Sequence, residues 1–243
     1  VLIFLEDISQ IAQQAQQMKL AGLGRLTAGI AHEIRNPLGA ISHAAQLLQE
    51  SEELDAPDRR LTQIIQDQSK RMNLVIENVL QLSRRRQAEP QQLDLKEWLQ
   101  RFVDEYPGRL RNDSELHLQL GAGDIQTRMD PHQLNQVLSN LVQNGLRYSA
   151  QAHGRGQVWL SLARDPESDL PVLEVIDDGP GVPADKLNNL FEPFFTTESK
   201  GTGLGLYLSR ELCESNQARI DYRNREEGGG CFRITFAHPR KLS

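Results

Sequence analysis

Residues 26–38 have the sequence LTAGIAHEIRNPL, which places a histidine, His32, on the polar side of an otherwise apolar helical pattern. Apolar residues recur around it at alternating intervals of three and four, namely Leu23, Leu26, Ile30, Ile34, Leu38, Ile41, Ala45 and Leu48. This spacing predicts one buried stripe on a helix. His32 lies two residues from both Ile30 and Ile34, and two helical steps turn by about 200°. The pattern therefore predicts an imidazole that faces solvent and not the core.

The neighbours of His32 favour a functional role for it. Glu33 adjoins it, and Arg35 and Asn36 follow three and four positions later on the same side. Pro37 lies inside the helical pattern, where a proline costs about 3 kcal/mol and leaves the carbonyl of residue 33 without its usual amide. We interpret this costly stretch as a site that a partner approaches. The alternative is an ordinary surface histidine on an amphipathic helix.

Composition indicates an intracellular globular protein. The 243 residues suffice for one large or two modest domains, and 38% hydrophobic with 25% charged residues is ordinary for such proteins. A net charge of −6 argues against nucleic acid as a direct partner. Cys213 and Cys231 form no disulfide or metal pattern, which favours a reducing cytosol. No apolar run approaches the roughly 20 residues of a membrane span.

The first half of the chain predicts a long helical hairpin. Residues 1–5, VLIFL, predict a strand, and residues 8–18 predict a helix leading into the histidine stripe. That helix is expected to end near Glu50, with a turn at 51–58. A second stripe follows at Leu61, Ile64, Ile65, Gln68, Met72, Val75, Ile76, Val79 and Leu82. Because a lone hairpin leaves half of its apolar surface in water, we expect two hairpins to pair as a four-helix bundle in a homodimer.

The second half predicts a different architecture. Arg84, Arg85 and Arg86 close the second helix, and residues 88–92 are expected to be a linker. Asp130 before Pro131 marks the start of a helix running to about Ser149. Helices are also expected at 95–99 and 204–215, and strands at 115–120, 125–129, 158–163, 172–176, 219–222 and 231–236. This alternation predicts a two-layer α/β sandwich, one sheet covered on one face.

Four separated segments carry polar groups suited to a nucleotide. Asn140 and Asn144 lie four apart on the Asp130 helix, with Arg147 one turn further. Residues 176–182, IDDGPGV, end a strand with Asp177 and turn at Gly179 and Gly181. Residues 191–197, FEPFFTT, and residues 200–206, KGTGLGL, complete the set. Glycines just before a helix expose amides that bind phosphate, although each segment alone is also explained by ordinary turns and core residues.

Together these motifs resemble those of sensor histidine kinases of two-component systems. The string from His32 to Leu38 resembles their phospho-accepting box, and the four segments resemble, in order, the N, G1, F and G2 boxes of their catalytic domain. That domain has the Bergerat (GHKL) ATP-binding fold shared with gyrase-type ATPases. The resemblance covers about residues 20–236. It implies the end of a sensory domain at 1–19, a dimerising phosphotransfer hairpin at 20–87, the linker at 88–92 and a catalytic ATP-binding domain at 93–243.

The resemblance implies roles for residues at matching positions. His32 accepts phosphate, Glu33 assists it, and Asn36 resembles the residue that orients water for dephosphorylation of the regulator. Asn144 resembles the Mg²⁺ ligand, with Asn140 as its companion, and Asp177 resembles the carboxylate that specifies adenine. The remaining positions resemble residues that line the nucleotide or shape the pocket and its lid, namely Arg147, Tyr148, Gly179, Gly181, Lys200, Gly201, Thr202, Gly203, Leu204 and Gly205.

The implied activity is transfer of phosphate from ATP to His32 and then to an aspartate of a response regulator. AGIAHEIRNPL, together with an NQA turn, resembles kinases that control type IV pilus genes, close to nitrogen-regulatory sensors. These act on enhancer-binding transcriptional activators. One departure is SNQA at 215–218, where many members have a His-Gly-Gly turn. We expect a cytoplasmic chain whose full-length protein is anchored in the bacterial inner membrane by an upstream region. The alternatives are a non-signalling ATPase and a catalytically silent dimeric adaptor.

Overall fold

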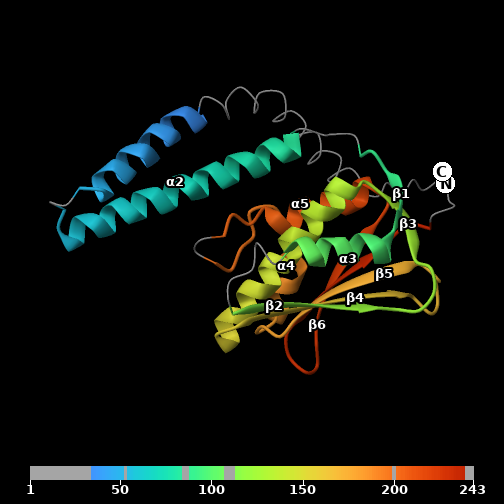
Figure 1. Ribbon diagram of the computed structural model, residues 1–243. Helices are drawn as coiled ribbons and strands as arrows, with labels where there is room; N and C mark the ends of the chain where they lie inside the picture. Colours follow the sequence, from blue (N-terminus) through green and yellow to red (C-terminus); the bar gives the residue numbers. More distant parts are fainter. Residues whose placement is uncertain (1–33, 52–53, 84–87, 107–112, 199–200, 239–243) are drawn as a thin grey trace, which may run out of the picture. The chain divides into compact units, whose positions relative to one another are not determined.

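The computed structural model describes residues 34–51, 54–83, 88–106, 113–198 and 201–238 (Figure 1). The described residues form two compact units, a helical unit of residues 34–83 with 197–202 and an α/β unit of residues 88–196 and 203–238. His32, Glu33, Lys200, the expected strand at 1–5, the expected helix at 8–18 and the arginines at 84–86 lie outside the described residues.

The helical unit is the expected hairpin. A helix over residues 34–49 lies antiparallel to α2 (Ala56–Ser83), since Arg35 approaches Glu77 at 3.9 Å and Gln49 Nε2 donates to Gln63 Oε1 at 3.1 Å. The first helix ends near Glu50, as predicted. The turn is shorter than the predicted 51–58, because Asp55 Oδ1 accepts the Asp58 amide at 2.9 Å and helical structure begins at Ala56.

The predicted apolar stripes of the hairpin are buried only in part. Leu38, Ile76 and Leu80 form a small buried cluster, and Thr62 and Ser69 extend the buried line along α2. Ala45 is also buried and Val75 is half-buried, but most of the large apolar side chains are exposed, because each helix covers only one side of the other. They are Ile34, Ile41, Leu47, Leu48, Leu61, Ile64, Ile65, Met72 and Leu74.

The α/β unit contains a five-stranded sheet with the order β2-β4-β5-β7-β6. β2 is parallel to β4, and the other neighbours are antiparallel. A separate pair joins β1 (Gln91–Asp94) to β3 (Gln126–Met129). The sheet strands are β2 (Ser114–Leu120), β4 (Gly156–Arg164), β5 (Pro171–Asp177), β6 (Arg219–Asn224) and β7 (Gly230–Thr235).

Three helices cover one face of this sheet (Figure 1), which confirms the predicted two-layer sandwich. They are α3 (Leu95–Glu105), α4 (Pro131–His153) and α5 (Gly205–Ser215). Burial alternates along β4, so Val158, Leu160 and Leu162 enter the core while the residues between them do not. On the opposite face, Arg223 of β6 pairs with Glu174 of β5 at 3.0 Å across the intervening strand β7.

The structure corrects several predicted boundaries. Gln91 and Gln92, expected in the linker at 88–92, belong to β1, whose pairing with β3 depends on a partner over 30 positions away. α4 continues past Ser149 to His153 and ends where Gly154 adopts a left-handed φ of 77°. A short 3-10 helix, η2 (Ala184–Asn189), was not predicted.

The departure at 215–218 forms a turn without glycine. Gln217 takes a positive φ of 58°, and the buried Asn216 donates through Nδ2 to Gln133 Oε1 at 2.7 Å. Cys213 and Cys231 are free and buried. None of the described helices has both the length and the apolar character needed to cross a membrane.

Candidate functional site

Asn36 lies within the first helix of the hairpin, where its side chain is exposed. Leu38, two residues on, is buried against α2. This arrangement leaves the Asn36 side open to solvent, and Arg35 is held beside α2 by Glu77.

The predicted N-box residues lie in the middle and second half of α4. Asn140 Nδ2 donates to Ser209 Oγ of α5 at 2.9 Å, and that hydroxyl donates to the Gly205 carbonyl at 3.0 Å. Asn144 Oδ1 accepts from Arg147 Nη2 at 2.9 Å. The Arg147 guanidinium lies 5.1 Å from the centre of the Tyr148 ring. Arg147 is therefore held between the side-chain oxygen of Asn144 and the ring of Tyr148.

Asp177 ends β5 and is only 7% exposed. Its Oδ1 accepts hydrogen bonds from the Gly179 amide at 2.9 Å and the Gly230 amide at 3.2 Å. Burial raises the pKa of this carboxyl above its ordinary value, and the two amides lower it in part. Both of these hydrogen bonds use Oδ1, so neither amide occupies Oδ2.

Close backbone approaches bring α4 against this carboxylate. A Cβ on Gly145 would lie 3.4 Å from Asp177 Cβ and 2.7 Å from Val158 Cγ2. A Cβ on Gly179 would lie 3.0 Å from Tyr148 Cβ. The glycine turn, residues 177–182, therefore packs directly on the helix that carries Asn144 and Tyr148.

The predicted G2 glycines meet two other predicted segments. Gly203 has a φ of 69°, and a Cβ there would lie 2.3 Å from the carbonyl carbon of Phe194, itself at a φ of 67°. A Cβ on Gly205 would lie 2.5 Å from Asn140 Oδ1. Leu204 is buried, and no side chain caps the start of α5. The amides of that first turn are oriented as an anion site requires.

The structure also describes Gly201, Thr202 and Gly181 of the predicted set. Gly201 and Thr202 are half-buried and group with the helical unit. Gly181 contacts Asn224 of β6, because a Cβ there would lie 2.7 Å from Asn224 Oδ1.

Several residues around the glycine turn were missed by the sequence reasoning. Gly230 donates to Asp177, Asn224 contacts Val182 through both of its side-chain polar atoms, and His153 Nε2 lies 2.7 Å from the Asp178 carbonyl oxygen. The run GGG at 228–230 was an available signal for a close backbone approach. Asn224 and His153 carry no local signal, because their partners lie far away in the sequence.

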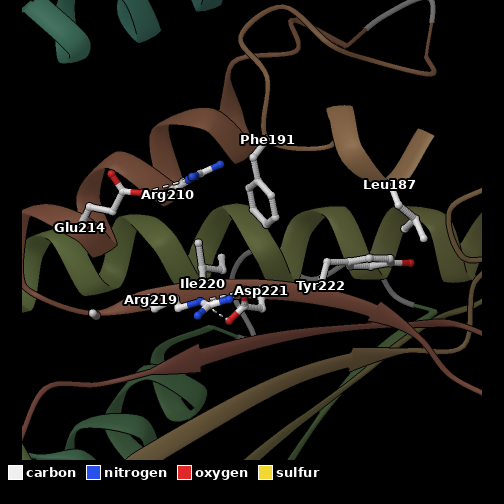
Figure 2. A pocket seen from close by; sticks show the side chains of 9 residues that line it. Leu187, Phe191, Arg210, Glu214, Arg219, Ile220, Asp221 and Tyr222 are labelled. Atoms are coloured by element: carbon white, nitrogen blue, oxygen red, sulfur yellow. Dashed lines mark hydrogen bonds and ion pairs between the residues drawn. The ribbon is translucent and has the colours of Figure 1, made fainter. Parts of the chain in front are cut away.

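A groove on the α/β unit lies between α5, β6 and the segment of η2 that leads to Phe191 (Figure 2). Apolar side chains from the two sides face each other across it, including Leu187, Phe191, Ile220 and Tyr222, and charged pairs such as Arg210 with Glu214 stand at its edge. Phe191, at the start of the predicted segment 191–197, lines this groove, whereas Asn140, Asn144, Asp177 and the predicted glycines do not. The groove is thus distinct from the cluster around Asp177.

Comparison with known proteins identifies the family. Residues 129–240 match the histidine kinase-, DNA gyrase B- and HSP90-like ATPase family, and residues 23–88 match the His Kinase A (phospho-acceptor) domain. The chain is 32% identical to the sensory histidine kinase/phosphatase NtrB of Rhodobacter capsulatus over 270 residues, which cover 100% of this chain and 70% of that protein.

Other relatives agree. Sporulation kinase A of Bacillus subtilis is 33% identical over 99% of this chain and 39% of its own length, and the sensor histidine kinase ZraS of Escherichia coli is 32% identical over 91% and 47%. The crystal structure of histidine kinase ThkA in complex with the response regulator protein TrrA has a TM-score of 0.67 at 25% identity, covering 99% of this chain and 70% of that one.

The chain belongs to the sensor histidine kinases, enzymes of the protein histidine kinase class. The predicted family, fold class and enzyme class are confirmed, and the ATPase family match confirms an ATP-binding type of domain. The chain spans about two fifths to one half of the length of relatives such as sporulation kinase A and ZraS.

Proposed function

We propose that this chain is the transmitter part of a sensor kinase that phosphorylates His32 from ATP and passes the group to a response regulator. The observation that carries the proposal is the buried Asp177, which two amides hold through Oδ1 beside the helix that carries Asn144. The match of residues 23–88 to the phospho-acceptor domain supports a histidine as the acceptor.

The pocket residues suit ATP. Asp177 Oδ2 is suited to accept a hydrogen bond from the adenine amino group, and the amides at the start of α5 are suited to phosphate oxygens. Arg147 is a flexible cation near Asn144, so it can turn toward a phosphate. Gly179, Gly181, Gly203 and Gly205 allow the close backbone contacts described above. We extend the same role to Tyr148, Lys200, Gly201, Thr202 and Leu204.

Asn144 is our proposed protein ligand of Mg²⁺. Its Oδ1 is a neutral hard oxygen, already used as an acceptor by Arg147, and such oxygens suit this cation. Among the described residues no group of three or more His, Cys, Asp or Glu could hold a metal ion, which favours a cation bound mainly by nucleotide and water. When bound, Mg²⁺ neutralises phosphate charge.

In the proposed reaction a ring nitrogen of His32 attacks the γ-phosphorus. A nitrogen–phosphorus bond forms while the bond to the bridging oxygen breaks and ADP leaves. Glu33 holds the proton on the other ring nitrogen and stabilises the positive charge that develops. A carboxylate of the regulator then takes the phosphoryl group. Asn36 is proposed to orient water in the reverse, phosphatase activity, and its exposure leaves room for a docked regulator.

The exposed apolar residues of the hairpin support a homodimer. One hairpin leaves Ile34, Ile41 and Leu48 uncovered at intervals of seven on its first helix. On α2, Leu61, Ile65 and Met72 are uncovered on one side. A second hairpin laid on these residues would complete a four-helix bundle.

The ThkA–TrrA structure and the names of the relatives support a response regulator as the partner of this chain. We further propose that the regulator is an enhancer-binding activator of type IV pilus genes, that the chain acts in the cytoplasm and that an upstream region anchors the full-length protein in the membrane. These proposals rest on the sequence resemblance.

Incubation with γ-labelled ATP and Mg²⁺ tests the proposal. We expect acid-labile, alkali-stable label on the chain, and loss of essentially all of it in His32→Gln. Phosphate release without labelled protein would indicate a simple ATPase, and failure to bind ATP would indicate an adaptor. Transfer to purified receiver domains identifies the regulator, and Asn36→Ala is expected to slow its dephosphorylation while sparing labelling of His32.

A further inference from the structure

The tip of the β6–β7 hairpin forms a support for the glycine turn. Asn224 and Gly230 face each other in the register of the two strands, and both contact residues of the turn. Gly230 donates its amide to Asp177 Oδ1. The backbones pack so closely that a Cβ on Gly229 would lie 2.0 Å from the Asp177 carbonyl oxygen. The turn can therefore move freely only if it separates from this tip.

Asn224 binds the far end of the turn through two hydrogen bonds. The Val182 amide donates to Asn224 Oδ1 at 2.9 Å, and Asn224 Nδ2 donates to the Val182 carbonyl at 2.7 Å. The side-chain amide thus pairs with Val182 as a neighbouring strand would. Tyr222 adds a third contact, because its hydroxyl donates to the same Oδ1 at 2.9 Å.

The conformation of the turn explains why it requires such support. Gly181 has a φ of 71° and lies against Asn224 Oδ1, so the chain reverses here in a conformation open mainly to glycine. Glycine has many alternative conformations when released. At the other end, the contact between His153 Nε2 and the Asp178 carbonyl oxygen ties the turn to the end of α4.

We propose that Asn224 is a positioning residue for nucleotide binding, which holds the glycine turn so that Asp177 Oδ2 faces the ligand. This inference rests on the proposed function, in which Asp177 binds adenine. Without Asn224 the turn populates released conformations, and the apparent affinity falls by the fraction of molecules that remain competent. Molecules that have bound ATP hold the turn in place, so the rate at saturating ATP changes little.

Three variants separate the interactions. Asn224→Ala removes both hydrogen bonds to Val182 and is expected to weaken AMPPNP binding roughly tenfold, as two modest hydrogen bonds allow. Asn224→Asp has the same shape but cannot donate to the Val182 carbonyl, so we expect a comparable or larger loss. Tyr222→Phe keeps the ring, which packs on Phe232 at 4.8 Å, and is expected to weaken binding only about twofold.

The test is titration calorimetry of the full chain with AMPPNP and Mg²⁺, combined with the rate of His32 labelling over a range of ATP concentrations. We expect the Asn224 variants to raise the KM for ATP and the Kd for AMPPNP together, with kcat within about twofold of the parent. Thermal unfolding of each variant verifies that it is folded. Asn188→Ala, an exposed asparagine of η2, is the matched control and should bind as the parent does.

A double-mutant cycle completes the test. If Tyr222 acts through Asn224, the effect of Tyr222→Phe disappears in the Asn224→Ala background. Unchanged affinity in a folded Asn224→Asp would overturn the positioning role, as would a loss of kcat at unchanged KM. The proposed function fails separately, if the parent chain binds no AMPPNP or if Asp177→Ala binds it as well as the parent.

Discussion

The surroundings of Asp177 have two opposing effects on the ionisation of its carboxyl group. Its side chain is buried, which disfavours the ionised form, and the two backbone amides at Oδ1 only partly offset this cost. A group whose pKa is raised by folding makes the native state less stable at pH values where it must ionise. Burial of this carboxyl therefore costs stability at neutral pH, which agrees with the ligand-binding role that we propose for Asp177.

Replacing Asp177 with asparagine should remove this cost and raise the free energy of unfolding by an amount that depends on pH. Asp177→Asn retains an oxygen for the Gly179 and Gly230 amides and carries no charge, so it should be more stable than the parent at pH 7.5. The gain should vanish as the pH falls below 3.8, the ordinary pKa of the group, because both chains are then neutral at this site.

Urea unfolding at pH 7.5 and at about pH 3.5 measures the difference. Asp185→Asn, at an exposed position of η2, is the control. A gain in stability that is the same at both pH values would contradict the explanation. The same variant should bind AMPPNP at least about tenfold more weakly, since an amide nitrogen can replace the accepting Oδ2.

At the scale of secondary structure, α4 is the element that organises the candidate site. Its first turn is capped by Asp130, whose Oδ1 accepts from the amides of His132 at 2.9 Å and Gln133 at 3.2 Å. The other oxygen accepts the Glu89 amide at 3.1 Å, and the Asp130 amide donates to Asn216 Oδ1 at 2.8 Å. One residue thus connects the start of α4 to the segment before β1 and to the end of α5.

Asp130→Ala is expected to lower the free energy of unfolding by about 2 kcal/mol, at the upper end for a cap, because the Glu89 contact is lost as well. Asp94 caps α3 with the amides of Lys96 and Glu97 but is exposed, so Asp94→Ala should cost about 1 kcal/mol. Asp130→Asn keeps the Oδ1 acceptor and should cost less than Asp130→Ala.

Equilibrium unfolding in urea measures all three variants. A loss for Asp130→Ala no greater than that for Asp94→Ala would show that the contacts beyond the cap add nothing to stability.

At the scale of the whole molecule, the two units differ in how far they can fold alone. The α/β unit buries a continuous core between its sheet and three helices. The helical unit buries a narrow row of side chains between its two helices and leaves large apolar side chains exposed beside that row. A surface of this kind is costly in water, so the hairpin is expected to find a second copy.

Ile65→Lys should shift the chain from dimer toward monomer. Ile65 lies with Leu61 and Met72 on one side of α2, and a lysine there would place a charge in the proposed interface. We expect the dimer dissociation constant to rise at least about tenfold.

Sedimentation equilibrium at micromolar concentration measures this change. Leu74→Lys is the control, because Leu74 is exposed to a similar degree but lies nine residues from Ile65, about two and a half turns, on the opposite side of α2. Equal effects of both substitutions would argue against an interface at Ile65.

Much of the architecture was predictable from local patterns. The helix at Asp130 and Pro131 begins where the cap and the first-turn proline indicate, and the strands expected between residues 115 and 236 are present with ends that differ by a few residues. β1 was missed because its four residues contain one buried position and no alternation of their own. The stripe on α2 predicted the helix well but overstated its burial, since periodicity does not show how many partners are available.

The order of motifs along the chain was sufficient to assign the family and the chemical type of each segment, because glycines, asparagines and a terminal strand carboxylate have strong local preferences. Tertiary structure decided which of these groups meet. Asn224 and Val182 are joined only because the β6–β7 hairpin returns beside the end of β5, and Gly205 reaches Asn140 only because α5 packs on α4. Contacts between residues far apart in sequence depend on strand register and helix packing, which no short segment encodes.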